Sequence, residues 1–85
     1  MILNGKAIRN SKIVNEATVE KSDDGMSYRD LLEDCLISLC KELDISVPMW
    51  LKKNTTEFVN FKKTTFTADQ FVEKIKFDRL EIRLI

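Results

Sequence analysis

The clearest pattern along the chain is a helical one over residues 28–43. Apolar residues recur there at intervals of three and four, which defines one apolar helix face. These residues are Tyr28, Leu31, Leu32, Cys35, Leu36, Leu39 and Leu43. Ser27 stands three residues before Asp30, a spacing typical of a capping box at a helix N-terminus. The pattern predicts an amphipathic helix, and Ile37 lies about 180° from the centre of its apolar face.

A second helix is predicted from Pro48 to about Lys62, because proline fits the first turn of a helix. One stripe, within about 100° of arc, contains mostly apolar residues. It consists of Trp50, Leu51, Asn54, Phe58 and Phe61. The opposite side is basic and polar, with Lys52, Lys53, Thr56, Asn60 and Lys63.

Residues 2–20 predict a β-hairpin. Asn4–Gly5 is a strong turn dipeptide, and Asn10–Ser11 is a weaker one between residues 6–9 and 12–20. Residues 12–20 alternate, with Ile13, Ala17 and Val19 on one side. Residues 79–85 alternate as well, which predicts a half-buried strand that pairs with the hairpin.

A third, short helix over residues 68–75 is predicted from a second capping pattern, Thr67 to Gln70. Taken together, the elements predict one α+β domain of residues 1–85. Its small antiparallel sheet combines the N-terminal hairpin with the C-terminal strand, and its two main helices lie on one face.

Charge is balanced in total but uneven along the chain. Fourteen basic and fourteen acidic residues cancel, yet residues 1–15 carry three basic residues and no acidic one. Residues 16–44 carry nine acidic against three basic residues, and residues 45–85 carry eight basic against five acidic ones. This uneven distribution of charge favours oriented association with a charged partner. Two solvated helix faces of opposite sign explain it equally well, and we favour this second interpretation.

The two cysteines indicate a reducing compartment. Cys40 follows Cys35 by five positions on the predicted helix, which places their Cα atoms about 8–9 Å apart and out of disulfide reach. We interpret them as packed thiols. No signal peptide and no apolar run of transmembrane length occurs, so we expect a cytoplasmic protein without membrane contact.

The absence of histidine excludes Ser-His-Asp and Cys-His nucleophile pairs. Two glycines are too few for a glycine-rich phosphate loop. The acidic pairs Asp23–Asp24, Glu33–Asp34 and Glu42–Asp44 fall in a loop or on a polar helix face, where water keeps them ionised. We therefore predict no enzyme, no catalytic or metal-binding residue and no cofactor.

Two sets of residues are candidates for contact with a partner. Ile37 and Asn54 are candidates for a protein–protein contact, although a single exposed apolar residue and a buried, hydrogen-bonded amide are the simpler interpretations. Lys52, Lys53 and Lys63 are candidates for contact with an anion or nucleic acid, against the alternative of a solvated surface. The leading hypothesis is a protein-interaction or assembly domain that forms a homodimer or is a small subunit of a larger assembly; the alternative is nucleic-acid binding by the second helix. An enzyme that combines residues of two chains ranks third.

Three segments of the chain resemble a known protein family. The stretches Pro48–Thr55, Thr67–Phe71 and Phe77–Ile82 make residues 28–85 similar to a family of small uncharacterised bacterial proteins of unknown function. The resemblance implies a bacterial cytoplasmic origin. It implies no site and no activity.

Overall fold

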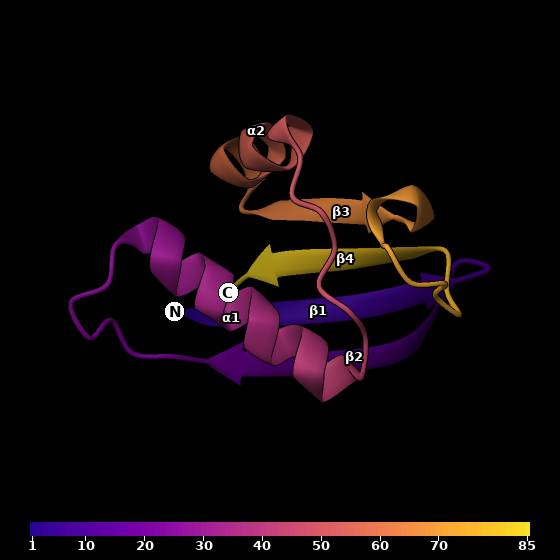
Figure 1. The fold of residues 1–85 in the computed structure, drawn as a ribbon, viewed down its shortest axis with the longest axis horizontal. Helices are drawn as coiled ribbons and strands as arrows, with labels where there is room; N and C mark the ends of the chain where they lie inside the picture. Colours follow the sequence, from indigo (N-terminus) through magenta and orange to yellow (C-terminus); the bar gives the residue numbers. More distant parts are fainter.

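Four antiparallel strands form a single sheet in the order β2-β1-β4-β3 (Figure 1). The computed structural model describes all residues from Met1 to Ile85. The strands are β1 (Ile2–Arg9), β2 (Lys12–Glu20), β3 (Lys63–Thr67) and β4 (Arg79–Leu84). Two helices, α1 (Tyr28–Leu43) and α2 (Lys52–Phe61), and the 3-10 turn η1 (Ala68–Gln70) complete the fold. The predicted α+β class, N-terminal hairpin and C-terminal strand are confirmed.

The hairpin turns at Asn10–Ser11, so the prediction of a turn at Asn4–Gly5 is wrong. Asn10 and Ser11 have φ angles of 51° and 64°, the two positive values that a two-residue hairpin turn of type I′ requires. Gly5 lies inside β1 instead, between Ala17 and Ile82 of the neighbouring strands. A Cβ atom at Gly5 would stand 2.7 Å from Leu39 Cδ2. The glycine therefore serves the close approach of α1 to the sheet.

Helix α1 begins and ends where the sequence pattern predicts, and it crosses β1 and β2 on one face of the sheet (Figure 1). The Ser27 hydroxyl accepts a hydrogen bond from the Asp30 amide at 3.2 Å. Asp44 ends the helix in the left-handed conformation. Twelve buried residues form one core cluster between α1, α2, the sheet and Phe71, and the completely buried ones include Leu3, Leu39, Phe66 and Leu80.

Helix α2 begins at Lys52, so the prediction of a start at Pro48 is wrong. Leu51, just before the helix, is still extended, with φ −99° and ψ 168°. Gln70 holds the segment before it: the Met49 amide donates to Gln70 O at 2.7 Å, and Gln70 Nε2 donates to Met49 O at 3.0 Å. These contacts, distant in sequence, replace the first helical turn. Phe61, predicted in the apolar stripe, is 66% exposed because α2 ends there beside the edge of β3.

Strand β3 is an element that the pattern analysis missed, and the predicted helix over residues 68–75 is wrong. Only η1 is helical in this region. Phe71 is buried as expected, but Val72 is 93% exposed. The residues of β3 read KTTFT, a short run of the β-branched and aromatic residues that suit a strand.

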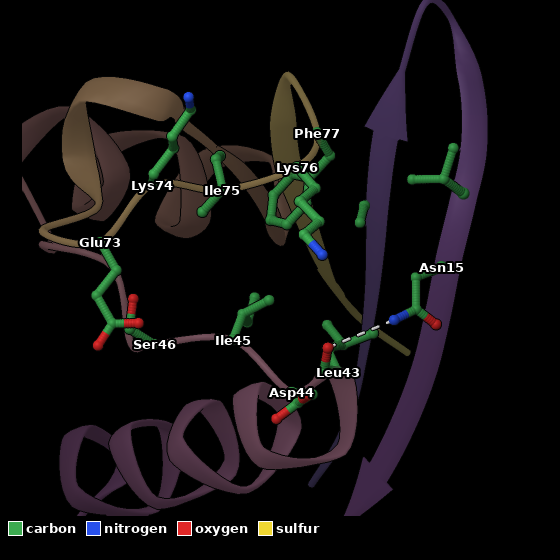
Figure 2. A pocket seen from close by; sticks show the side chains of 12 residues that line it. Asn15, Leu43, Asp44, Ile45, Ser46, Glu73, Lys74, Ile75, Lys76 and Phe77 are labelled. Carbon is green, nitrogen blue, oxygen red and sulfur yellow. Dashed lines mark hydrogen bonds between the residues drawn. The ribbon is translucent and has the colours of Figure 1, made fainter.

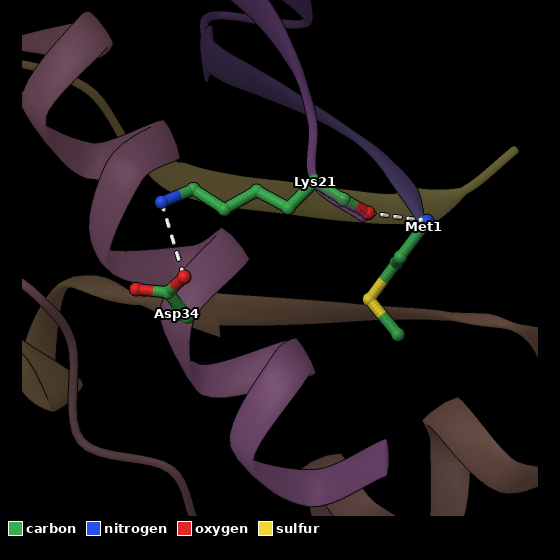
Figure 3. A network of polar contacts seen from close by, with 3 residues as sticks. All are labelled: Met1, Lys21 and Asp34. Atoms are coloured by element: carbon green, nitrogen blue, oxygen red, sulfur yellow. Dashed lines mark hydrogen bonds and ion pairs between the residues drawn. The ribbon is translucent and has the colours of Figure 1, made fainter. Parts of the chain in front are cut away.

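Lys21 connects the start of β1 and the end of β2 to helix α1 (Figure 3). The amino group of Met1 donates to Lys21 O at 2.8 Å, and the Lys21 amide donates back to Met1 O at 2.9 Å. The Lys21 side chain reaches Asp34 of α1 at 3.0 Å, the one ion pair of the structure. Lys21 therefore links the hairpin to the helix.

Candidate functional site

Neither of the two residues predicted to contact a protein partner is freely exposed. Ile37 is half-buried on α1. Asn54 has no exposed surface, and its side-chain amide is fully used within the chain. Its Oδ1 accepts from the Leu51 amide and from Gln70 Nε2, both at 2.9 Å, while its Nδ2 donates to Thr64 Oγ1 and Thr65 O at 2.7 and 3.1 Å. Asn54 thus has no atom with which to contact a partner in this structure.

The three lysines predicted to form one basic helix face belong to two elements. Lys52 and Lys53 occupy the first turn of α2, whereas Lys63 opens β3 and pairs with Arg83 across the sheet. All three lysines are exposed. A hydrogen bond from the Thr67 hydroxyl is the main cause that lowers the pKa of Asp69, and Lys53 adds a smaller effect of its charge. The Asp69 carboxylate is therefore close enough to Lys53 to be affected by its charge.

The two edges of the sheet differ, and the β3 edge is covered by the chain itself. The outward-facing carbonyl of Thr65 accepts from Asn54 Nδ2, and the outward-facing amide of Thr67 donates to Gln70 Oε1 at 3.1 Å. These two side-chain amides take the place of a neighbouring strand. Helix α2 packs against the same edge. Part of the β3 edge is therefore already hydrogen-bonded within the chain.

The β2 edge is open. Met1 and Lys21 exchange both backbone hydrogen bonds, and hydrogen-bonded pairs alternate with non-bonded ones along an antiparallel ladder. Because Asn4–Thr18 and Ile2–Glu20 are the non-bonded pairs of this register, the backbone groups of Thr18 and Glu20 point away from β1. They make no hydrogen bond within the chain. An unpaired strand edge of this kind is a template for another strand.

A β-bulge shapes the tip of this open edge. Ala7 pairs with Asn15 and Ile8 with Ile13, so Val14 is the extra residue. A bulge bends its strand and redirects side chains. Ile13 and Val14 are consequently 52% and 54% exposed, which adds apolar surface to the open edge. Asn15 holds the bulged strand to α1, because its Nδ2 donates to Leu43 O at 3.4 Å.

A cavity of about 400 Å³ lies beside the bulge (Figure 2). The end of α1, the tip of the hairpin and the loop of residues 73–77 enclose it. Six of its twelve lining residues are hydrophobic, among them Val14, Ile45, Ile75 and Phe77. The other lining residues include two carboxylates and two lysines, so the cavity is apolar in part and charged in part.

Cys35 and Cys40 lie neither on the β2 edge nor in the cavity wall. Cys35 and Cys40 are free and buried, as the packed-thiol interpretation predicts. Burial raises the pKa of Cys40 to about 11 and also raises that of Cys35, so both thiols stay protonated at neutral pH. No group of three or more histidine, cysteine or carboxylate side chains is arranged to hold a metal ion.

Comparison with known proteins adds no relative. No family model, no curated protein and no solved structure matches the chain. The resemblance to small bacterial proteins therefore stays a prediction. Neither helix has the length and apolar content needed to cross a membrane.

Proposed function

We propose that this protein is a non-enzymatic assembly domain that forms a homodimer through the open edge of β2. The observation that carries the proposal is the contrast between the two sheet edges. The chain covers β3 with Asn54 and Gln70, but on the outer side of β2 the backbone groups of Thr18 and Glu20 have no partner, and the Glu16 amide is bonded to the Asn15 side chain. Joining two such edges would satisfy backbone groups in both copies.

The charges of β2 favour a second copy as the occupant. The strand begins with basic Lys12, next to the turn and Arg9, and ends with acidic Glu20. Antiparallel pairing about a two-fold axis brings the end that carries Lys12 toward the partner's end that carries Glu20, although the two side chains are not directly opposite each other when the axis passes through Ala17. The opposite charges of the two strand ends therefore favour an antiparallel second copy, the arrangement of an isologous contact.

Among the registers centred on Glu16, Ala17 and Thr18, in the middle of the outer edge, the one centred on Ala17 avoids repulsion between like charges. An axis through Glu16 would set two Glu16 carboxylates opposite each other, and an axis through Thr18 would set Glu16 opposite the partner's Glu20. Like charges directly opposite each other destabilise a strand pair. An axis through Ala17 sets Glu16 opposite the partner's Thr18 and leaves two small alanines at the centre. It also places the outward-facing groups of Thr18 and Glu16 in bonded positions, where the Glu16 amide would exchange its Asn15 Oδ1 partner for the second copy.

Light scattering coupled to size exclusion tests the proposal, from micromolar to millimolar protein. We expect twice the mass of the chain at the upper end. In the Ala17-centred register, Thr18→Glu places a carboxylate opposite the partner's Glu16, whereas Thr18→Lys places an ammonium there. Both variants lose the same hydrogen bond from Asn4, so they are matched.

The dissociation constant should rise for Thr18→Glu and fall or stay constant for Thr18→Lys. The two variants should differ by about tenfold, since each such pair contributes about 0.2–1 kcal/mol and occurs twice. A monomer at every concentration would contradict the homodimer. A dimer that responds equally to both variants would place its interface elsewhere. The buried free thiols support the accompanying proposal of a reducing, cytoplasmic location.

A further inference from the structure

The cavity beside the bulge contains an unsatisfied hydroxyl. Ser46 Oγ is the one buried side-chain polar atom without a hydrogen-bond partner in the structure, and Ser46 lines the cavity. Buried polar atoms are nearly always hydrogen-bonded, and leaving one without a partner costs about 1–3 kcal/mol. Because this oxygen exposes almost no surface, a group in the cavity reaches it only after the Ser46 side chain rotates toward the opening.

Charges of both signs also line the cavity without neutralising one another. Asp44 and Glu73 contribute carboxylates, and Lys74 and Lys76 contribute ammonium groups. None of them forms an ion pair, because the single ion pair of the protein is Lys21–Asp34. Figure 2 shows Lys76 extending toward the space between Phe77 and the end of α1, while Lys74 points away from it. Ser46 and Glu73 appear together on the side away from Lys76.

Apolar side chains form the rest of the wall. Ile45, Ile75 and Phe77 come from the two segments that face each other across the cavity, and Val14 comes from the bulge. A volume of about 400 Å³ lies within the usual range of small-molecule sites, which combine apolar walls with a few placed polar groups. The wall thus combines an apolar part with carboxylates and ammonium groups, and Lys76 and Glu73 lie on opposite sides of the cavity (Figure 2).

We propose that this cavity binds a small zwitterion with an apolar body, of the chemical class of an α-amino acid with an aliphatic side chain. Its carboxylate would pair with the Lys76 ammonium. Its ammonium group would pair with Glu73 and, once Ser46 rotates, donate to Ser46 Oγ, and its aliphatic side chain would contact Ile45, Ile75 and Phe77. The proposal does not depend on the homodimer, because all of these residues belong to one chain.

A titration followed by amide chemical shifts in NMR tests it, with L-leucine as the probe. Two analogues serve as matched ligands: 4-methylpentanoate lacks the amine, and isoamylamine lacks the carboxylate. We expect saturable shifts at Val14, Ser46 and Ile75 with L-leucine. Each analogue should bind about tenfold more weakly, since each loses a hydrogen bond to a charged group. No saturable shift with L-leucine up to millimolar concentrations would overturn the proposal, as would equal binding of the three ligands.

Variants of the two lysines assign the site. Lys76→Met should weaken L-leucine binding about tenfold, because it removes the partner of the carboxylate. Lys74→Met is the matched control, since Lys74 lines the same cavity but points away (Figure 2), and it should leave binding unchanged. Equal effects of the two variants would overturn the assigned geometry. Both side chains are exposed, so neither variant removes core packing.

Discussion

One missing side chain, at Gly5, allows α1 to lie directly on β1. The nearest atoms to a Cβ at this position all belong to Leu39, which is completely buried. We predict that Gly5→Ala lowers the free energy of unfolding by about 1–3 kcal/mol, the usual cost of overpacking a core. Urea denaturation measures it.

The same contact provides the control for this prediction. In a Leu39→Ala background the space above Gly5 is free, so adding Gly5→Ala should cost clearly less than in the natural protein. Such non-additivity is expected for two residues in contact. Additive losses in the double variant would show that the glycine is needed for another reason.

The buried thiol of Cys40 predicts a dependence of stability on pH. Burial raises its pKa in the folded protein from 9.0 to about 11. Below pH 9 the thiol is protonated in both states, and its contribution to stability is complete. As the pH rises toward 11, the unfolded chain loses the proton first, and the free energy of unfolding should fall by up to about 2 kcal/mol.

Urea denaturation of the natural protein and of Cys40→Ala, at pH 8 and at pH 10.5, measures this effect. Cys40→Ala is less stable at both pH values because it leaves a cavity, but the part of the pH dependence that Cys40 causes should disappear. An identical fall in both proteins would assign the effect to other groups.

At the scale of elements, the accuracy of prediction follows the range of the interactions that set each boundary. Helix α1 is specified by its own residues, from Ser27 to Leu43, and its predicted bounds are confirmed, although Tyr28 of the predicted apolar face is exposed. The start of α2 depends on Gln70, about twenty residues away, which holds Met49 in an extended segment. Local periodicity cannot contain that information, so Pro48 alone suggested an earlier start.

Asn54 joins three elements, and its removal should be costly. Asn54→Ala would deprive the Leu51 amide, the Thr65 carbonyl and the Gln70 amide of their buried partner. We predict a loss of at least about 2–3 kcal/mol in the free energy of unfolding, since each unsatisfied buried group costs about 1–3 kcal/mol. Asn60→Ala on the exposed side of the same helix is the control and should change stability little. Equal effects of the two variants would show that the Asn54 network contributes nothing.

At the scale of the whole molecule, the candidate site depends on the order of the strands. The hairpin and the C-terminal strand were predicted, but an alternating sequence does not show which strand ends at an edge. Strand β4 pairs with β1, and β3 adds beyond it, so β2 is left open and Ile13 and Val14 are left exposed. Ile37 was chosen from a helical wheel alone, which contains no information on neighbouring elements.

The arrangement of charge over the molecule also bears on the nucleic-acid alternative. Lys63 and Arg83 are neighbours on the face of the sheet opposite α1, but Lys6 on the same face stands between Glu81 and Glu16. Lys52 and Lys53 lie on α2, apart from this face. Carboxylates therefore interrupt the basic groups, and the net charge is zero. Modules that bind nucleic acid normally present an uninterrupted basic stripe.

We therefore predict weak binding of short duplex DNA, single-stranded DNA and RNA at low salt, and none at physiological ionic strength. If Lys52, Lys53 and Lys63 each neutralised a phosphate, the logarithm of affinity for duplex DNA would fall with the logarithm of salt concentration with a slope of about −2 to −3. A fluorescence titration at two salt concentrations measures it. Lys52→Ala/Lys53→Ala is compared with Lys63→Ala/Arg83→Ala, so that the helix and the sheet are tested separately. Sub-micromolar binding that survives physiological salt and is lost in either double variant would contradict the prediction and assign nucleic-acid binding to that surface.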